Sequence, residues 1–236
     1  HSVRALSFEQ LSVLSEYTWI VHAHVDEQPA EVEQCLAEHG CRPLELFAKA
    51  GLLSERFSAV HFTHPSPEEI ALLRQARGHV VACPTTEMDL GDGFLPIESL
   101  DGIGLSVGTD SHARIDPLAE IRALEWHARA RLQRRCVTTA SEDPEALSAG
   151  LLAMGSEGGA RALGLNTGRI QEGCRADLIA VDVSHTALCT GPVLTNLVFA
   201  GQPSMVQEVW VGGEQRLWEG RHPLADTVRR RAMAHL

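Results

Sequence analysis

Four short apolar runs, each followed by a segment with helical features, constrain the fold of this chain more than any other feature of its sequence. The runs are rich in β-branched residues, which suits strands buried on both faces of a parallel sheet. They span residues 18–25, 56–63, 79–83 and 103–107. Helices are expected at residues 29–39, from residue 67 onward and at 118–134. The repeated strand-then-helix order predicts an α/β protein built from βα units.

Four residues of functional interest stand where the predicted strands end. They are His24, His61, Pro84 and Asp110. In a (β/α)8 barrel the carboxyl ends of the strands carry the active site, and in an open doubly wound sheet the same ends carry the ligand. Both architectures therefore predict a functional site at this edge, and the strand pattern by itself does not choose between them.

Histidine and carboxylate residues near these strand ends have the chemistry of a metal site. His22 and His24 are two apart in a predicted strand, so both face the same way and can share an ion. The alternative is a core histidine beside an edge histidine. His61 and Asp110 add the imidazole and carboxylate donors that zinc and iron bind. Glu27 is placed to act as a general acid or base, so metal-assisted hydrolysis is the favoured reaction class.

Composition narrows the class of partner. The 236 residues carry 20 Lys and Arg against 31 Asp and Glu, a net charge of −11, and 44% are hydrophobic. A chain with this balance can bury a core, and its negative charge argues against nucleic acid and anionic membranes as partners. It has no signal-peptide pattern, no apolar run of about 20 residues and no C-x-x-C pair. A cytoplasmic protein with a small-molecule substrate is therefore expected.

The character of the sequence changes after residue 166. Residues 168–182 contain turns and a short apolar strand, and residues 208–218 form a predicted hairpin with a Gly-Gly turn. This pattern predicts a small β-rich domain closed by a basic terminal helix. The expected domains are therefore residues 1–166 and residues 167–236.

Five motifs occur in an order that resembles the amidohydrolase superfamily. They are HAHVDE at 22–27, VHFTH at 60–64, CPTTEMDLGDGFLP at 83–96, GTDSH at 108–112 and GRIQEGCRADLIAVD at 168–182. The resemblance runs over nearly the whole chain and implies a metal-dependent hydrolase with a (β/α)8 barrel. Within the superfamily, the motifs are most similar to those of deiminases in histidine breakdown. These enzymes hydrolyse N-formimino-L-glutamate to N-formyl-L-glutamate and ammonia.

The resemblance also assigns roles to residues at the strand ends. It implies that His24 and Asp110 are ligands of a divalent metal, with Zn²⁺ expected and iron as the alternative. It implies that His61 contacts the water activated by the metal, and that His61, Asp110 and Glu27 are catalytic. Glu27 corresponds to the glutamate that carries protons to the departing nitrogen. His22 then supports the rim of the site and does not bind metal.

Two residues at the start of the chain match a segment that contacts substrate in the family. They are His1 and Arg4. The planar guanidinium of Arg4 can pair with both oxygens of a carboxylate, which suits an acidic amino-acid substrate. The alternative is an aminohydrolase acting on a nucleobase or related amidine, which the aromatic content of 5% does not favour. Glu87 lies in a loop that family members place near the substrate.

The resemblance covers only the second half of such a barrel. Family members begin with a small β-domain and a first strand whose H-x-H pair binds metal, and this sequence has no counterpart of either. A complete barrel takes about 250 residues, which is more than precede the C-terminal β segment. The N-terminal half is therefore expected in the same or a companion chain, and a homodimer is expected. The alternative is a non-catalytic half-barrel that needs the missing part.

Overall fold

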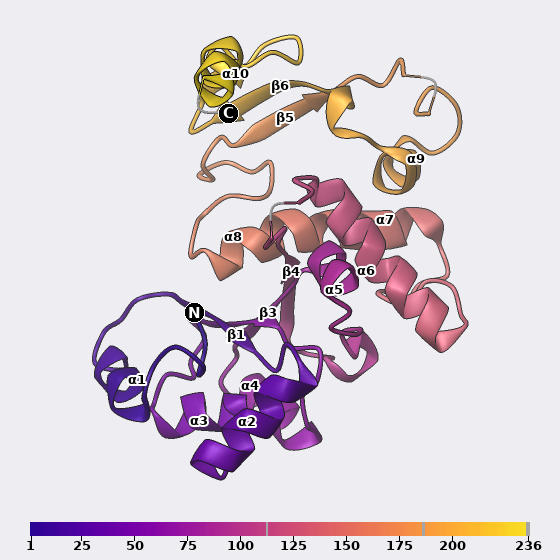
Figure 1. Ribbon diagram of the computed structural model, residues 1–236. Helices are drawn as coiled ribbons and strands as arrows, with labels where there is room; N and C mark the ends of the chain where they lie inside the picture. Colours follow the sequence, from indigo (N-terminus) through magenta and orange to yellow (C-terminus); the bar gives the residue numbers. More distant parts are fainter. Residues whose placement is uncertain (112, 186, 235–236) are drawn as a thin grey trace.

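A parallel sheet of four strands lies at the centre of the first half of the chain (Figure 1), as the strand-then-helix pattern predicts. The computed structural model describes residues 1–111, 113–185 and 187–234. The strands pair in sequence order and are β1 (Val21–Val25), β2 (Phe57–His61), β3 (His79–Ala82) and β4 (Gly104–Val107). Each lies inside a predicted run, so the apolar pattern located all four strands.

Helices lie before, between and after these strands (Figure 1). They are α1 (Phe8–Leu14), α2 (Pro29–His39), α3 (Pro43–Lys49), α4 (Pro67–Gln75), α5 (Pro84–Leu90), α6 (Pro117–Leu132), α7 (Pro144–Ala153), α8 (Gly159–Ala162) and α9 (Val193–Ala200). Proline opens α2 to α7, because its fixed φ suits the first helical turn and its missing N–H is not needed there. Shorter helical turns are η1 (Ile97–Ser99), the π-helix η2 (Met154–Gly158) and η3 (Pro203–Met205).

Three of these helices were predicted and the others were not. The predictions for α2, α4 and α6 are confirmed. By contrast, α1, α3 and α5 have seven residues each, too few for an apolar period of 3.6 residues to stand out. The positions of these short helices depend on the hydrogen bonds that cap their ends and on packing against the sheet.

The main core lies between the sheet and helices α2 to α4. Its fully buried members include Val25, Phe57, Ala59 and Val80 from the strands and Leu44 and Leu73 from the helices. Full burial of one such large side chain contributes about 1.5–3 kcal/mol. A second cluster joins α6, α7 and α9 through Ile121, Leu147, Leu151 and Val198. These two cores hold the strand ends in place.

The second sheet is antiparallel and lies apart from the first (Figure 1). It contains β5 (Leu178–Val181), β6 (Val206–Val211) and β7 (Glu214–Leu217). The predicted hairpin is confirmed: β6 and β7 are joined by Gly212 and Gly213, with φ of +61° and +82°. Glycine adopts this left-handed backbone without steric cost. The division into domains at residue 166 stays a prediction.

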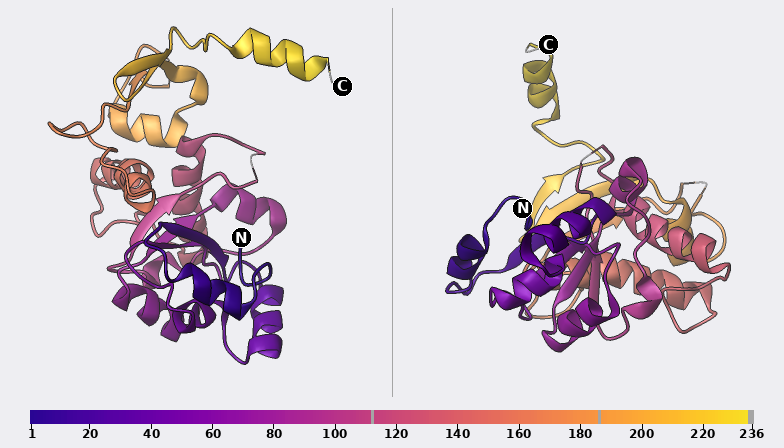
Figure 2. Two further views of the ribbon diagram at one scale, coloured as in Figure 1. Left: turned by 90° about the vertical axis from the view of Figure 1, so that its left-hand side faces the viewer. Right: turned by 60° about the horizontal axis from the view of Figure 1, so that its bottom comes forward.

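The predicted terminal helix is present and exposed. Helix α10 (Ala225–Met233) has no buried residue, and Figure 2 shows it extending away from the rest of the molecule. The predicted basic helix is thus present, and its assignment to the small β-rich domain stays a prediction. The helix is polar and carries Arg229, Arg230 and Arg231, which leaves little apolar surface for packing. In the described part of the chain, no helix has the length and apolarity needed to cross a membrane.

A buried histidine lies at the opposite end of the sheet from the predicted site. His79 begins β3, and its Nε2 lies 3.0 Å from Ser106 Oγ of β4. Its Nδ1 has no hydrogen-bond partner among the described residues. Burial, followed by the positive charges of Arg161 and His22, lowers the pKa of His79 from 6.5 to about 4.

Acidification from pH 6.5 to 4 is expected to destabilise the folded chain by about 3 kcal/mol through His79. In this window the unfolded chain binds a proton at His79 and the folded chain does not, so the free energy of unfolding falls with pH. Urea unfolding at half-unit pH steps measures how steeply the free energy of unfolding changes with pH. His79→Asn should make this dependence flatter, whereas His222→Asn, at an exposed position, should leave it unchanged. Equal slopes in wild type and His79→Asn would contradict the prediction.

Candidate metal centre and active site

Backbone conformation is unusual where the strands end at the predicted site. Asp26, His61 and Asp110 have φ of +52°, +69° and +44°, in the left-handed region that side-chain-bearing residues rarely occupy. Such conformations cost on the order of 1–3 kcal/mol each and persist only where surrounding contacts impose them. At these strand ends the chain turns sharply and aims the side chains of His61 and Asp110 at the same place.

The curl of the sheet brings residues from its two outermost strands together. In a flat sheet, β1 and β4 would lie roughly 14 Å apart, because neighbouring strands are about 4.8 Å apart. Donor atoms of His24 in β1, His61 at the end of β2 and Asp110 after β4 nevertheless lie within 4.8 Å of one another. We call these three residues the donor group. The geometry is that of part of a barrel wall.

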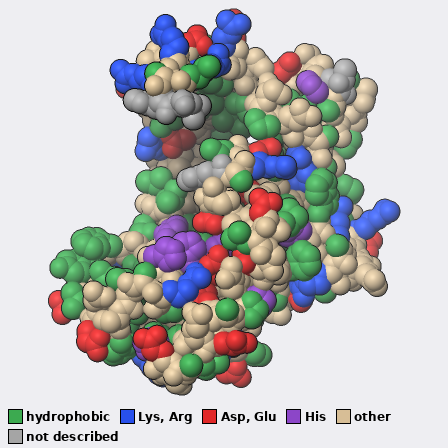
Figure 3. Space-filling model, in the orientation of Figure 1, with side chains coloured by type: hydrophobic (Ala, Val, Ile, Leu, Met, Phe, Trp, Pro, Cys, Tyr) green, Lys and Arg blue, Asp and Glu red, His purple; other side chains and the backbone are tan. Residues whose placement is uncertain are grey.

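The distances within the donor group suit a shared cation. His24 Nε2 lies 3.5 Å from Asp110 Oδ1, and His61 Nε2 lies 3.9 Å from Asp110 Oδ2. The imidazole rings of His24 and His61 are stacked, with centroids 5.3 Å apart. Figure 3 shows histidine side chains gathered at one place on this face of the molecule, with acidic side chains beside them.

The other ring nitrogen of each histidine is held by an acceptor. His24 Nδ1 donates to the carbonyl oxygen of His1 over 3.0 Å, and His61 Nδ1 lies 3.3 Å from Glu87 Oε1. His61 Nε2 is buried and has no hydrogen-bond partner among the described residues. A divalent metal would satisfy this orphaned nitrogen, and two imidazoles with a carboxylate match the donors that zinc prefers. The residues therefore fit a zinc-type ion.

His61 lies among three carboxylates. Burial, the largest single cause, lowers the pKa of its imidazole. The hydrogen bond and charge of Glu87, together with the charges of Glu27 and Asp110, outweigh burial, so the pKa of His61 is raised overall. Because His61 belongs to the donor group, the geometry also allows it to act as a third ligand, a role beyond the predicted contact with water.

Glu27 points toward the donor group from a buried position. Its Oε1 lies 3.7 Å from His61 Nε2, and its Oε2 accepts a 2.5 Å hydrogen bond from Arg4 Nη2. Its backbone N–H donates to Glu31 Oε2 over 2.8 Å. A carboxylate beside the donor group but outside it is in the position that proton transfer requires. The proton-transfer role stays a prediction.

The two residues predicted to contact substrate lie at the edge of the same site. Arg4 forms its ion pair with Glu27, and its side chain remains 31% exposed. His1 is exposed, and its ring centroid lies 4.7 Å from that of His24. The sequence predicted a substrate contact for Arg4 but not its ion pair with Glu27. Both substrate contacts stay predictions.

Other residues of the motifs have structural contacts. His22 Nε2 donates to the carbonyl oxygen of Ala162 over 2.8 Å, which ties β1 to α8 and turns His22 away from the donor group. Residues 104–108 read G-x-S-x-G, but Ser106 is buried inside β4 and not on the sharp turn of a nucleophile elbow. His112, the last residue of GTDSH, lies outside the described residues.

Asp26 adds little charge to the site. Its side chain is fully buried, and its Oδ1 lies 3.7 Å from Arg42 Nη2. Burial, with the negative charge of Glu69 as the next cause, raises the pKa of Asp26 to about 9 even though Arg42 opposes the shift. The carboxyl group of Asp26 is therefore largely uncharged at neutral pH.

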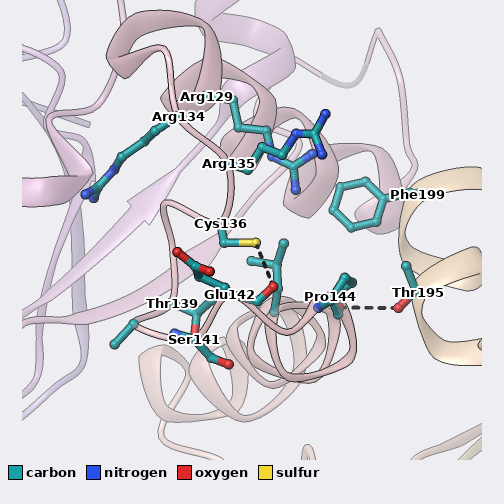
Figure 4. A pocket seen from close by; sticks show the side chains of 12 residues that line it. Arg129, Arg134, Arg135, Cys136, Thr139, Ser141, Glu142, Pro144, Thr195 and Phe199 are labelled. Carbon is teal, nitrogen blue, oxygen red and sulfur yellow. Dashed lines mark hydrogen bonds between the residues drawn. The ribbon is translucent and has the colours of Figure 1, made fainter.

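A separate cavity lies away from the donor group. It has a volume of about 980 Å³ and is lined by residues of α6, α7, α9 and the loop between α6 and α7. Figure 4 shows the side chains of Arg129 and Arg135 near Phe199, whereas Arg134 points away from them. Arg129 is already paired with the buried carboxylate of Glu125 at 2.7 Å. None of the predicted site residues lines this cavity.

The comparisons with known proteins agree with this geometry. The sequence model of the amidohydrolase family matches residues 1–216. Formimidoylglutamate deiminase of Pseudomonas aeruginosa is 33% identical over 94% of this chain and 51% of its own length. A 5-methylthioadenosine/S-adenosylhomocysteine deaminase of Teredinibacter turnerae is 36% identical over 83% of this chain and 44% of its own length.

A solved structure shows the same fold. The adenosine deaminase of Xanthomonas campestris, determined with bound zinc, superposes with a TM-score of 0.87 at 29% identity. The match covers 98% of this chain and 53% of that one. The chain thus spans about half the length of the relatives it matches, and its curled four-stranded sheet corresponds to part of a barrel. From its sequence motifs, its fold and its hydrolase relatives, this chain belongs to the amidohydrolase family.

Proposed function

We propose that this chain provides the catalytic strand ends of a metal-dependent deiminase that converts N-formimino-L-glutamate and water into N-formyl-L-glutamate and ammonia. The observation that carries the proposal is Arg4. It places a partly exposed guanidinium beside Glu27 and the donor group, where a substrate carboxylate can reach it. The similarity to formimidoylglutamate deiminase over 94% of this chain supports the same substrate.

Each residue of the site has a distinct part in the proposed reaction. His24 and Asp110 would hold the metal, with His61 beside them. When bound, Zn²⁺ or iron supplies Lewis-acid chemistry that activates water near neutral pH. Glu27 would carry a proton to the nitrogen that leaves as ammonia, using Oε1, the oxygen that faces His61. Arg4 orients the other oxygen of Glu27 through its hydrogen bond.

A second candidate substrate is a purine nucleoside. Several relatives are named 5-methylthioadenosine/S-adenosylhomocysteine deaminases, and they are 30–37% identical to this chain. Both of their named substrates carry an adenine ring. 5-Methylthioadenosine has no carboxylate for Arg4 to pair with, whereas the homocysteine part of S-adenosylhomocysteine has one. Arg4 therefore separates N-formimino-L-glutamate from 5-methylthioadenosine only.

We propose that four further strands complete the barrel, in the same or a companion chain. In the described part of the chain, β1 and β4 are each paired along one edge only. An unpaired edge of a parallel sheet leaves backbone N–H and C=O groups for another strand. Alone, this chain would be a half-barrel without turnover. A homodimer and a cytoplasmic location also remain proposals.

Replacing Arg4 with Met is expected to lower kcat/KM for N-formimino-L-glutamate roughly 30- to 5,000-fold. This range corresponds to the 2–5 kcal/mol lost when the substrate carboxylate is left buried in the site without its charge partner. The substrate carboxylate does not change charge during the reaction, so most of the loss should fall on KM. Steady-state kinetics of the full-length gene product measures both constants, with an uncharged formamidine as the comparison substrate.

Arg56→Met is the matched control, because Arg56 is exposed and precedes β2 at the far end of the sheet. It should leave both constants unchanged. If Arg4→Met slows the charged and uncharged amidines equally, Arg4 only supports Glu27, and the acidic substrate is wrong. Faster turnover of 5′-methylthioadenosine than of N-formimino-L-glutamate by the wild type would favour the second candidate.

A further inference from the structure

Glu87 is a buried carboxylate that the proposed chemistry does not use. It lies in the first turn of α5, directly after β3, and its side chain is 1% exposed. Its Oε1 accepts a 2.8 Å hydrogen bond from the backbone N–H of Cys83 and lies 3.3 Å from His61 Nδ1. Oε2 has no hydrogen-bond partner among the described residues. A buried carboxylate with one oxygen unsatisfied is costly unless its charge has a use.

Glu87 and Asp110 lie on opposite sides of the His61 ring. The ring of His61 is fully buried, with Glu87 on its Nδ1 side. On its Nε2 side lie Glu27 Oε1 at 3.7 Å and Asp110 Oδ2 at 3.9 Å. A carboxylate oxygen accepts a hydrogen bond and does not donate one, so the 3.3 Å contact is a hydrogen bond only when Nδ1 carries the proton. In that tautomer the lone pair of Nε2 faces Asp110 and Glu27.

We infer that Glu87 is a positioning residue that keeps His61 in the Nδ1–H tautomer and aims Nε2 at the metal position that His61 shares with His24 and Asp110. The same relation holds for His24, whose Nδ1 donates to the carbonyl oxygen of His1. Acceptors on the outer nitrogen of a metal-site histidine commonly fix its tautomer and orientation. The effect of Glu87 on catalysis rests on the proposed function. The tautomer of His61 does not depend on that proposal.

A purely structural role for Glu87 makes a different prediction. Its bond to the Cys83 N–H satisfies one of the free amides at the start of α5, so Glu87 serves the helix as well. If this were its whole role, substitution would lower stability and leave the ring of His61 unchanged. The state of the His61 ring therefore separates the two roles.

The tautomer is measured on the metal-free 236-residue chain labelled with ¹⁵N, at pH 8.5, by long-range ¹H–¹⁵N correlation of the histidine rings. His61→Gln assigns the signals. The wild type is expected to show the Nδ1–H form of His61. Glu87→Ala should show a mixture with the Nε2–H form, whereas Glu87→Gln should restore the wild-type pattern because its amide oxygen still accepts from Nδ1.

Zinc affinity of the same chains gives the second readout, by titration against a chromophoric chelator. Loss of an acceptor behind a metal-site histidine typically weakens binding 10- to 100-fold, so Glu87→Ala is expected to bind Zn²⁺ that much more weakly than Glu87→Gln. Glu120→Gln is the matched control. Glu120 is also buried and accepts from Thr85 N–H and Oγ1 in the same turn of α5, with no contact to His61.

The tautomer of His61 and the zinc affinity together test the inference. If Glu87→Ala does not fold, Glu87→Asp takes its place, because the shorter aspartate keeps the negative charge but holds it farther from His61 Nδ1. An unchanged tautomer and unchanged zinc affinity in the folded variant would overturn the inference. Because neither measurement uses a substrate, failure of the proposed deiminase activity would leave this result standing.

Discussion

Replacing Glu27 with Gln is expected to slow turnover of N-formimino-L-glutamate about 10²- to 10⁴-fold while the metal stays bound. General acid–base catalysis contributes a factor of that size. A glutamine at this position keeps the shape of the side chain but cannot take up and release a proton. Glu27 is not a member of the donor group, so metal content should not change. The measurements are kcat of the full-length gene product and its metal content by elemental analysis.

The matched control is Glu33→Gln, which removes the same charge from an exposed position in α2. It should leave kcat and metal content unchanged. Glu27 also accepts a hydrogen bond from Arg4, so the melting temperature of Glu27→Gln must be recorded. Loss of metal in Glu27→Gln would show that Glu27 is a ligand and would overturn its assignment to proton transfer.

Replacing Asp110 with Asn is expected to weaken metal binding by about 100-fold or more and to abolish turnover. Replacing a residue that hydrogen-bonds to a metal ligand typically weakens metal binding 10- to 100-fold. Replacing the ligand itself is expected to weaken binding at least as much. Asp110 brings the negative charge that faces both His24 Nε2 and His61 Nε2, and the neutral amide removes it. Competition with a chelator of known zinc affinity measures the change.

Asp101→Asn is the control for Asp110→Asn, because Asp101 is exposed in the turn that precedes β4. It should bind zinc as the wild type does. The fold should survive in both variants, since Asp110 is not part of the hydrophobic core. Wild-type zinc affinity in Asp110→Asn would mean that the two histidines hold the metal with ligands from outside this chain, and Asp110 would lose its assigned role.

The sequence by itself determined the parts of this protein that depend on local pattern. Apolar runs of five to eight residues located β1 to β4, and alternation around a Gly-Gly turn located the hairpin of β6 and β7. The placement of His24, His61 and Asp110 at one edge followed from a topological rule: parallel strands end on the same side of their sheet. These features could be predicted because each depends on neighbours in sequence or on strand direction alone.

Only the tertiary structure decided which of those residues touch. The curl of the sheet brings Asp110 to His24 from the opposite edge, and the turn after β3 places Glu87 behind His61. The Arg4–Glu27 pair likewise joins residues 23 positions apart. A motif records the identity and order of residues, whereas hydrogen bonds and metal sites depend on distances of a few ångströms. Those distances are set by sheet curvature and core packing, which are properties of the whole fold.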